Sequence, residues 1–273
     1  MGLKRKIKSL FLKFQKTVKE PVYIPVMCGN ILNGKTILIT GGTGGIGKAI
    51  AESCVKNGAK VIIAARNIDK LQGIAQELNA IPYELDISNV NEMKDALIQL
   101  MKEQKINVLI NCAGIHSGDI FLYTAEKDFD NTIEVNLKGT YFLSQVFSNY
   151  LISEGIGGNI LNISSVSGMR PAISPYMVSK WGVQGLTQGM AKKLIKYGIV
   201  VNAIAPGPVA TEMLKLDGSN LNYAGSPAGR YLDPAEIANL AVFMISDMGR
   251  MIVGDTVYAT GGCGNLTYDD IAY

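Results

Sequence analysis

Two kinds of hydrophobic pattern alternate along most of this 273-residue chain. Short apolar runs, typical of buried strands, occur at 35–40, 60–65, 81–85, 107–111, 158–163, 199–204 and 255–259. Between these runs, apolar residues recur at helical spacing over 46–57, 68–78, 89–104, 128–154, 176–197 and 234–246. Strands that alternate with helices build a parallel sheet covered by helices on both faces. The pattern therefore predicts an α/β fold with a doubly wound, seven-stranded parallel sheet.

The first 20 residues carry a different pattern, in which apolar side chains form a stripe along one face of a predicted helix. The stripe consists of Leu3, Ile7, Leu10, Phe11, Phe14 and Val18. This segment also holds seven basic residues and one acidic residue, so the rest of the chain is net negative although the whole chain carries +3. Such a helix fits peripheral contact with an anionic membrane surface, and it equally fits packing on the protein itself or on a neighbouring subunit. We expect a basic amphipathic arm and linker over 1–33, followed by one domain over 34–273.

The composition narrows the classes of function. A hydrophobic fraction of 48% and a charged fraction of 18% argue against disorder, and no stretch approaches the roughly 20 apolar residues that span a bilayer. The net negative charge of the main domain gives no reason to expect a nucleic-acid partner. The four cysteines are scattered and His116 is the only histidine, which argues against a metal site and against a Ser-His-Asp triad. A reduced, cytoplasmic protein is the simplest interpretation, with attachment at the inner face of the membrane if residues 1–20 bind lipid.

The first predicted strand is followed by a glycine-rich turn, TGGTGGIG, at residues 40–47. Glycines let a backbone turn tightly and approach a pyrophosphate closely, and the helix that follows presents unpaired N–H groups to its negative charge. A strand, a glycine turn and a helix in this order are typical of a Rossmann-type dinucleotide site. The spacing fits both T-G-x-x-x-G-x-G and T-G-x-x-G-x-x-G, so the turn alone leaves the contacting glycines open.

The residues just after the next strands are also informative, because ligands of such sheets bind at the carboxyl ends of the strands. Arg66 follows the second strand, at the place where a fold selective for NAD usually has an acidic residue. An arginine there can pair with a 2′-phosphate, which predicts NADPH rather than NADH; the alternative is a solvated surface arginine. After the third strand, Asp86 can accept a hydrogen bond from the adenine amino group, or it can cap a helix that begins near Ser88.

Tyr176 and Lys180 lie one helical turn apart, which places a phenol and an ammonium group on one face of a helix. A phenol titrates near pH ~10, so it is a poor acid–base catalyst unless a nearby cation favours its ionised form. The spacing is not specific by itself, because Tyr123 and Lys127 repeat it. The difference is the serine-rich segment 164–167 at the end of the fifth predicted strand, where a hydroxyl can hydrogen-bond a substrate carbonyl.

Together these motifs resemble the short-chain dehydrogenase/reductase family, in its single-domain branch. The resemblance runs from about residue 32 to about residue 265 and rests on the 40–47 turn together with Asp86, Asn111-Cys112-Ala113-Gly114, Asn136, Ser165, Tyr176, Lys180 and Pro206-Gly207-Pro208-Val209-Ala210-Thr211. It implies hydride transfer between a nicotinamide and a carbonyl or alcohol carbon, in a Rossmann-type fold. The family commonly forms homotetramers, so we expect a homotetramer or a homodimer. The resemblance also implies that Gly41, Gly45 and Gly47 are the glycines that contact the cofactor.

The family's pattern assigns catalytic roles to four residues. Tyr176 would exchange the proton on the substrate oxygen, and Lys180 would lower the pKa of Tyr176 and hold the nicotinamide ribose. Ser165, rather than Ser164, would polarise the carbonyl, because the family's serine is typically followed by two residues and a glycine. Asn136 would support a water that relays protons to Lys180. The expected cofactor-binding residues are Thr40, Gly41, Thr43, Gly45, Ile46, Gly47, Arg66, Asp86, Ile87, Asn111, Ala113, Gly114, Tyr176, Lys180, Pro206, Gly207, Val209 and Thr211.

The sequence leaves the substrate open. The segment 212–233 is the predicted substrate lid, and its mixed polarity does not separate a sugar from an acyl or another carbonyl substrate. His116 can face the substrate, although a loop histidine without a catalytic role is the simpler interpretation, and Cys112 is expected to be a packed, inert thiol. The main hypothesis is an NADPH-dependent oxidoreductase that acts on a small carbonyl or alcohol substrate. The alternative is a catalytically silent, dinucleotide-binding sensor or scaffold protein.

Overall fold

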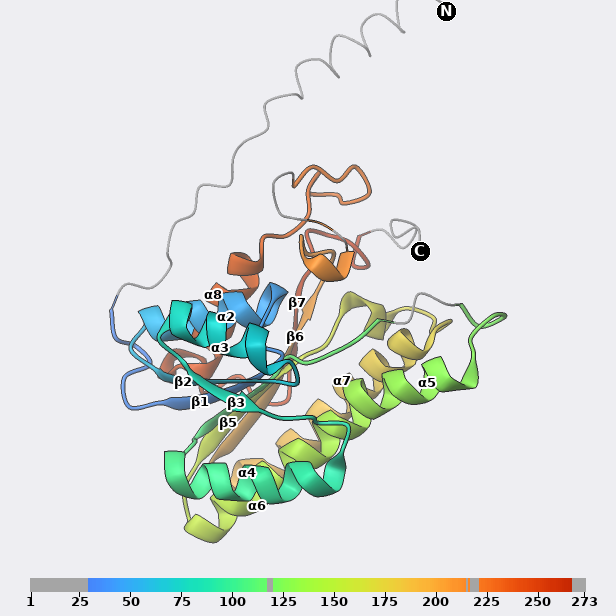
Figure 1. Ribbon diagram of the computed structural model, residues 1–273. Helices are drawn as coiled ribbons and strands as arrows, with labels where there is room; N and C mark the ends of the chain where they lie inside the picture. Colours follow the sequence, from blue (N-terminus) through green and yellow to red (C-terminus); the bar gives the residue numbers. More distant parts are fainter. Residues whose placement is uncertain (1–28, 117–119, 215, 217–220, 267–273) are drawn as a thin grey trace, which may run out of the picture.

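A computed structural model describes residues 29–116, 120–214, 216 and 221–266. The expected amphipathic helix over 1–20, and with it any membrane contact, lies outside the described residues. Among the helices that are described, none is both long and apolar enough to cross a membrane. The described residues form two layers of helices around a single sheet (Figure 1).

All seven predicted strands are present, and neighbouring strands are parallel throughout. The strands are β1 (Thr36–Thr40), β2 (Lys60–Ala65), β3 (Ile81–Glu84), β4 (Val108–Asn111), β5 (Gly158–Ile163), β6 (Ile199–Pro206) and β7 (Thr256–Ala259). Their order in the sheet is β3-β2-β1-β4-β5-β6-β7, so the direction of winding reverses between β1 and β4. At such a reversal the connections leave toward opposite faces, and a crevice opens at the carboxyl ends of the strands. The predicted doubly wound α/β fold is confirmed.

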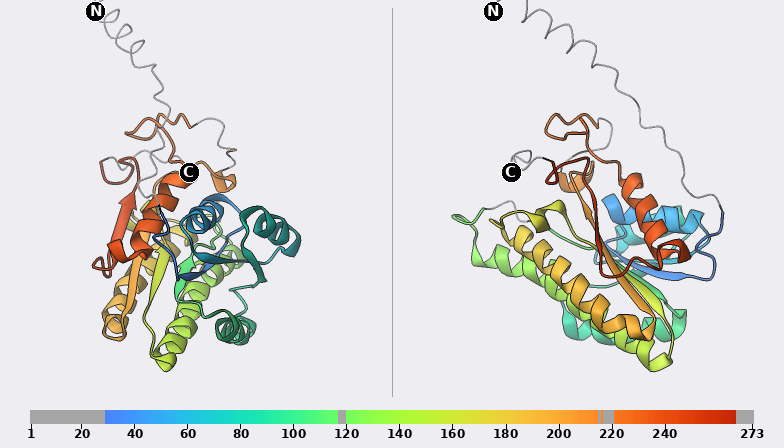
Figure 2. Two further views of the ribbon diagram at one scale, coloured as in Figure 1. Left: turned by 90° about the vertical axis from the view of Figure 1, so that its left-hand side faces the viewer. Right: turned by 180° about the vertical axis from the view of Figure 1, so that it is seen from behind.

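The two helical layers follow from the alternation of side chains along each strand. In β1, Ile37 and Ile39 belong to the core under one layer, and Leu38 belongs to the core under the other. The first layer contains α2 (Gly45–Lys56), α3 (Ile68–Leu78) and α8 (Pro234–Ile245), as Figures 1 and 2 show. The second layer contains α4 (Val90–Gln104), α5 (Glu126–Ile133), α6 (Thr140–Glu154) and α7 (Pro175–Leu194). Both faces of the sheet are therefore covered, as the continuous apolar runs of the strands require.

One predicted helix is not continuous. The helical pattern over 128–154 corresponds to α5 and α6 joined by a π-helical segment, η1 (Glu134–Gly139). A π-helical turn inserts an extra residue into a helix and redirects the side chains next to it, often at functional sites. Here it carries Asn136, which is buried. The remaining short helices are η2 (Val166–Met169), η3 (Ile195–Tyr197), η4 (Glu212–Leu214) and η5 (Asp247–Gly249).

Candidate active site

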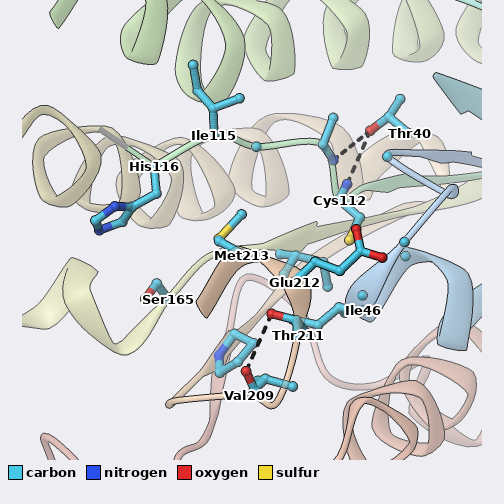
Figure 3. A pocket seen from close by; sticks show the side chains of 18 of the residues that line it. Thr40, Ile46, Cys112, Ile115, His116, Ser165, Val209, Thr211, Glu212 and Met213 are labelled. Carbon is cyan, nitrogen blue, oxygen red and sulfur yellow. Dashed lines mark hydrogen bonds between the residues drawn. The ribbon is translucent and has the colours of Figure 1, made fainter. Parts of the chain in front are cut away.

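A cleft of about 1060 Å³ lies at the carboxyl ends of the strands, beside the reversal between β1 and β4. All but two of the predicted site residues line it, and the exceptions are Asn111 and Asn136. Figure 3 shows His116 and Ser165 at one end of this cleft and Thr40 at the other. Residues from β1, β2, β5 and β6, from the segment that follows β4, and from the lid thus meet in one place, although they are far apart in the sequence.

The glycine turn is built by two different constraints. Gly41 and Gly45 have left-handed backbone angles, with φ of 69° and 51°, which glycine adopts far more readily than other residues. Gly47 is required by close approach, because a Cβ atom there would lie 2.2 Å from the carbonyl oxygen of Gly41. These are the three glycines that the family resemblance selected, and the turn they form leaves its backbone open to the cleft.

Gly47→Ala is therefore expected to destabilise the fold by about 1–3 kcal/mol and to weaken dinucleotide binding, because the methyl group collides with backbone that cannot move aside. Gly73→Ala is the matched control: Gly73 lies inside α3, and a Cβ atom there meets nothing within 4 Å. This control is expected to gain roughly 0.5–1 kcal/mol from helix propensity. Chemical denaturation measures both changes. Equal stabilities of the two variants would contradict the packing argument.

The hydroxyl of Thr40 ties the glycine turn to the end of β4. It accepts hydrogen bonds from the backbone N–H groups of Cys112 and Ala113, both at 3.2 Å, and it contacts the Ile110 carbonyl at 3.5 Å (Figure 3). This arrangement holds the segment 112–114 along the cleft. Burial raises the pKa of the Cys112 thiol to about 12, so the thiolate is disfavoured.

The two asparagines that do not line the cleft stabilise its walls instead. The Asn111 amide donates hydrogen bonds to Ser144 in α6 and to Asn162 in β5, at 2.9 and 2.8 Å. Its side chain therefore points toward α6 and β5, and the predicted role of Asn111 in cofactor binding stays a prediction. The Asn136 amide donates to the Ile115 carbonyl at 2.9 Å and accepts from the Ile115 N–H at 2.8 Å.

Asn136 also joins this segment to α7, because its amide donates to the Ser179 hydroxyl at 3.1 Å. The π-helical turn makes this possible by directing Asn136 inward, between the 114–116 segment and α7. A Cβ atom on Gly114 would lie 3.4 Å from the Asn136 Oδ1 atom and 3.7 Å from the Lys180 Nζ atom. Asn136 thus lies beside Lys180, behind the surface of the cleft.

Lys180 is a buried cation at the end of the cleft that also holds Ser165 and Tyr176. Its ammonium group donates to the Ile163 carbonyl at 2.9 Å and lies 5.5 Å from the centre of the Tyr176 ring. Burial lowers the pKa of Lys180 from 10.5 to about 8, so the group is charged at neutral pH but is poised to lose its proton. α7 positions both side chains one turn apart, and Ser174 caps the start of this helix by accepting from the Met177 N–H.

The structure also separates the two candidate serines. Ser164 donates its hydroxyl hydrogen bond to the Lys180 carbonyl at 3.2 Å, so this group is used inside the fold. Ser165 precedes η2, where its hydroxyl accepts from the Ser167 N–H at 3.1 Å and its hydrogen remains to be donated. This geometry favours Ser165 over Ser164 as the group that faces a substrate oxygen.

His116 lies closer to Tyr176 than the sequence suggests. Its ring packs on the Tyr176 ring with 4.7 Å between centroids, and it lines the cleft. Partial burial lowers the pKa of His116, so the neutral imidazole is favoured at neutral pH. No local signal in the sequence reveals this contact, because the two residues lie 60 positions apart.

At the other end of the cleft, Arg66 is exposed just after β2 and lines the cleft together with Lys70 and Asp86. Asp86 accepts from both the N–H and the hydroxyl of Ser88, at 2.9 and 2.7 Å. The expectation that Asp86 caps a helix is wrong, because α4 begins at Val90 and its cap is Asn89.

The described part of the lid begins with η4 and ends in a short hairpin. Asn222 and Arg230 form an antiparallel bridge, and the Arg230 guanidinium makes two 2.7 Å hydrogen bonds to Glu236 at the start of α8. Within this hairpin, Tyr223 and Tyr231 stack with 4.4 Å between ring centroids, and both line the cleft. Nearer β6, the lid base contributes Glu212, Met213 and Leu214 to the lining.

Comparisons with known proteins agree with this geometry. The family model for short chain dehydrogenases matches residues 35–222. A 3-oxoacyl-[acyl-carrier-protein] reductase, FabG, of Rickettsia felis is 34% identical over 236 residues, covering 85% of this chain and 97% of the relative. An L-rhamnose-1-dehydrogenase of Scheffersomyces stipitis is 35% identical over 251 residues, covering 85% of this chain and 96% of the relative.

Solved structures show the same similarity. A short-chain type dehydrogenase/reductase from Mycobacterium marinum is 31% identical, with a TM-score of 0.79 over 85% of this chain and 96% of that one. A variant of actinorhodin polyketide ketoreductase, solved with NADPH, is 27% identical, with a TM-score of 0.78 over 87% of this chain and all of that one, 100%. The chain therefore belongs to the short-chain dehydrogenase/reductase family of NAD(P)-dependent oxidoreductases, which act on carbonyl and alcohol groups.

Proposed function

We propose that this protein is an NADPH-dependent reductase of a carbonyl substrate, with Tyr176 as its acid and base. The observation that carries the proposal is the buried ammonium group of Lys180 beside the Tyr176 ring, at the end of the cleft that also holds Ser165. A scaffold protein would gain nothing from a buried cation, which costs free energy. Perturbed titratable groups in a cleft are typical of catalysis.

The residues fit a nicotinamide dinucleotide. The turn lacks side chains at Gly41, Gly45 and Gly47 and lines the cleft at the start of α2, where a helix N-terminus suits a pyrophosphate. Segment 112–114 would run along the nicotinamide ribose, which Lys180 and Tyr176 would bind. Val209 and Thr211 would flank the carboxamide and the pyrophosphate; their own contact, from the Thr211 hydroxyl to the Val209 carbonyl, measures 3.4 Å. When bound, NADPH supplies the hydride.

The protein's own part in the reaction is to bind the carbonyl and to give it a proton. Ser165 donates a hydrogen bond to the substrate oxygen, and Tyr176 transfers its phenolic proton to that oxygen as the carbonyl becomes an alcohol. The charge of Lys180 stabilises the phenolate that remains. Asn136 fixes the position of the Ile115 segment against α7 and supports the path by which Lys180 and Tyr176 are reprotonated.

Arg66 is proposed as the residue that selects the phosphorylated cofactor. Arg66→Ser is expected to raise the Kd for NADPH roughly 10- to 100-fold while that for NADH changes little, because a charged hydrogen bond to the 2′-phosphate is lost. Arg250→Ser removes an exposed arginine outside the cleft and serves as the control. Titration calorimetry with each nucleotide measures the effect. Equal losses for NADPH and NADH would show that Arg66 does not read the 2′-phosphate.

The substrate is best sought among ketones of acyl thioesters and among sugars. Relatives include 3-oxoacyl-[acyl-carrier-protein] reductases and an L-rhamnose-1-dehydrogenase, which represent these two classes. Apolar lid residues Met213 and Leu214 in the lining favour the acyl class. The test is to measure NADPH oxidation with a panel of ketoacyl thioesters and a panel of sugars. Protein that binds NADPH but reduces no carbonyl would favour the catalytically silent sensor or scaffold instead.

We further propose a cytoplasmic homo-oligomer, a homotetramer or a homodimer. The second helical layer supports this, because it exposes large apolar side chains at Phe129, Tyr141, Val178 and Trp181. Light scattering of the purified protein tests the assembly. Peripheral membrane contact through residues 1–20 is tested by co-sedimentation with anionic liposomes before and after deletion of that segment.

A further inference from the structure

An ion pair spans the cofactor end of the cleft. The Lys70 ammonium group, in the first turn of α3, lies 3.1 Å from the Glu212 carboxylate at the lid base, 142 positions away in the sequence. Both residues line the cleft. We refer to this pair as the Lys70–Glu212 latch.

The latch lies over the glycine turn. A Cβ atom on Gly44 would lie 3.6 Å from the Lys70 Nζ atom and 3.8 Å from a Glu212 carboxylate oxygen. The neighbouring Thr211 methyl group would lie 3.2 Å from a Cβ atom on Gly45. The lid base thus rests on the turn that is proposed to receive the cofactor's phosphates, and a carboxylate occupies the approach to it.

The position of Lys70 points to an anionic ligand. Lys70 is the third residue of α3, and its N–H donates to the helix cap Asn67 at 2.9 Å. A cation in the first turn of a helix opposes the helix dipole, so Lys70 is not placed there to stabilise α3. Arg66 lines the same end of the cleft. This end therefore holds two cations, Arg66 and Lys70, together with the positive end of the α3 dipole.

The Glu212 carboxylate and a dinucleotide phosphate are the two anionic groups that Lys70 could bind, and their charges decide which one it binds more strongly. Its bond to Glu212 is exposed, with 45% of the lysine side chain and 78% of the glutamate side chain accessible, and such pairs contribute little. A dinucleotide phosphate carries equal or greater charge and more acceptor oxygens. It would also repel the Glu212 carboxylate. The exchange of Glu212 for a phosphate is therefore favourable.

On the basis of the proposed function, we propose that Lys70 binds a phosphate of the dinucleotide and that Glu212 competes for it until the cofactor enters. Binding breaks the Lys70–Glu212 pair and frees the lid base from α3. Lys70 is a binding residue in this scheme, and Glu212 sets the affinity of the cleft by holding Lys70 in the cofactor-free protein.

The test compares four single variants by titration calorimetry with NADP⁺. Lys70→Gln is expected to raise the Kd about tenfold, and Glu212→Gln is expected to lower it severalfold, because the competitor and its repulsion are removed. The matched controls are Lys48→Gln and Glu77→Gln, which break a 2.9 Å ion pair between α2 and α3 outside the cleft. They report the effect of a changed net charge alone.

NAD⁺, 2′,5′-ADP and ADP identify which phosphate Lys70 binds. If Lys70→Gln weakens the binding of NADP⁺ and 2′,5′-ADP but not of NAD⁺ and ADP, Lys70 binds the 2′-phosphate. If it weakens the binding of all four equally, Lys70 binds the pyrophosphate. The proposal is overturned if Lys70→Gln matches Lys48→Gln, or if Glu212→Gln weakens binding. Wild-type protein that binds no NADP⁺ would refute the proposed function itself, which is a separate result.

Discussion

Tyr176→Phe is expected to reduce kcat for carbonyl reduction by about 10²- to 10⁴-fold, the usual contribution of a positioned acid. The phenyl ring keeps the packing against His116, whose ring lies 4.7 Å away, so the cleft retains its shape. The phenolic hydroxyl is lost, and the transferable proton with it. Binding of NADPH is expected to change little, and kcat with saturating NADPH, followed by its absorbance, measures the effect.

The chain provides its own control for this variant. Tyr123 and Lys127 repeat the spacing of Tyr176 and Lys180, but the Tyr123 side chain is 75% exposed and does not line the cleft. Tyr123→Phe should therefore leave kcat unchanged. If Tyr176→Phe retains activity, the proton has another source, and the adjacent His116 becomes the first residue to replace.

The sheet could be predicted from local pattern because most strands are short, continuous apolar runs, whereas apolar residues in the segments between them recur at helical spacing. In β1, every residue from Ile37 to Ile39 is buried, with alternate side chains in the two cores. Burial on both faces produces a continuous apolar run, which is a strong signal in the sequence. The glycine turn was also predictable from local sequence, since Gly41, Gly45 and Gly47 fall within seven residues.

Contacts between distant segments could not be predicted in this way. The π-helical turn at Asn136 shifts the helical pattern by a single residue, which leaves the apolar spacing over 128–154 nearly unchanged. The contact of the His116 ring with the Tyr176 ring and the pairing of Lys70 with Glu212 depend on how distant segments meet at the edge of the sheet. Asn111 shows the same limit: its place at the end of β4 was predictable, but the direction of its side chain was not.

Lys180→Met is expected to remove most activity and, relative to the wild type, to raise the stability of the cofactor-free protein at neutral pH. The reason is the buried ammonium group, whose pKa falls from 10.5 to about 8 on folding because it loses water. That difference corresponds to about 3 kcal/mol of folding free energy. Methionine has a similar length and carries no charge, although the Ile163 carbonyl then loses its 2.9 Å hydrogen bond.

The pH dependence of stability separates the cost of the buried charge from the loss of the hydrogen bond to Ile163. Below about pH 8 the folded and unfolded states both hold the Lys180 proton, so the wild type carries the full penalty of the buried charge. Between about pH 8 and pH 10.5 the folded state has released the proton and the unfolded state still binds it, so wild-type stability rises with pH. The lost hydrogen bond does not vary in this way. The stability of Lys180→Met relative to the wild type should therefore fall by about 2 kcal/mol between pH 7 and pH 10.

Urea denaturation of both proteins at matched concentration measures this difference. Lys192→Met is the control, because Lys192 lies in the last turn of the same helix and is exposed. If the stability difference between Lys180→Met and the wild type does not change with pH, burial of the Lys180 charge does not destabilise the folded protein. If this stability difference falls as the pH rises and the variant has lost turnover, the cation beside Tyr176 lowers the stability of the fold and is required for activity.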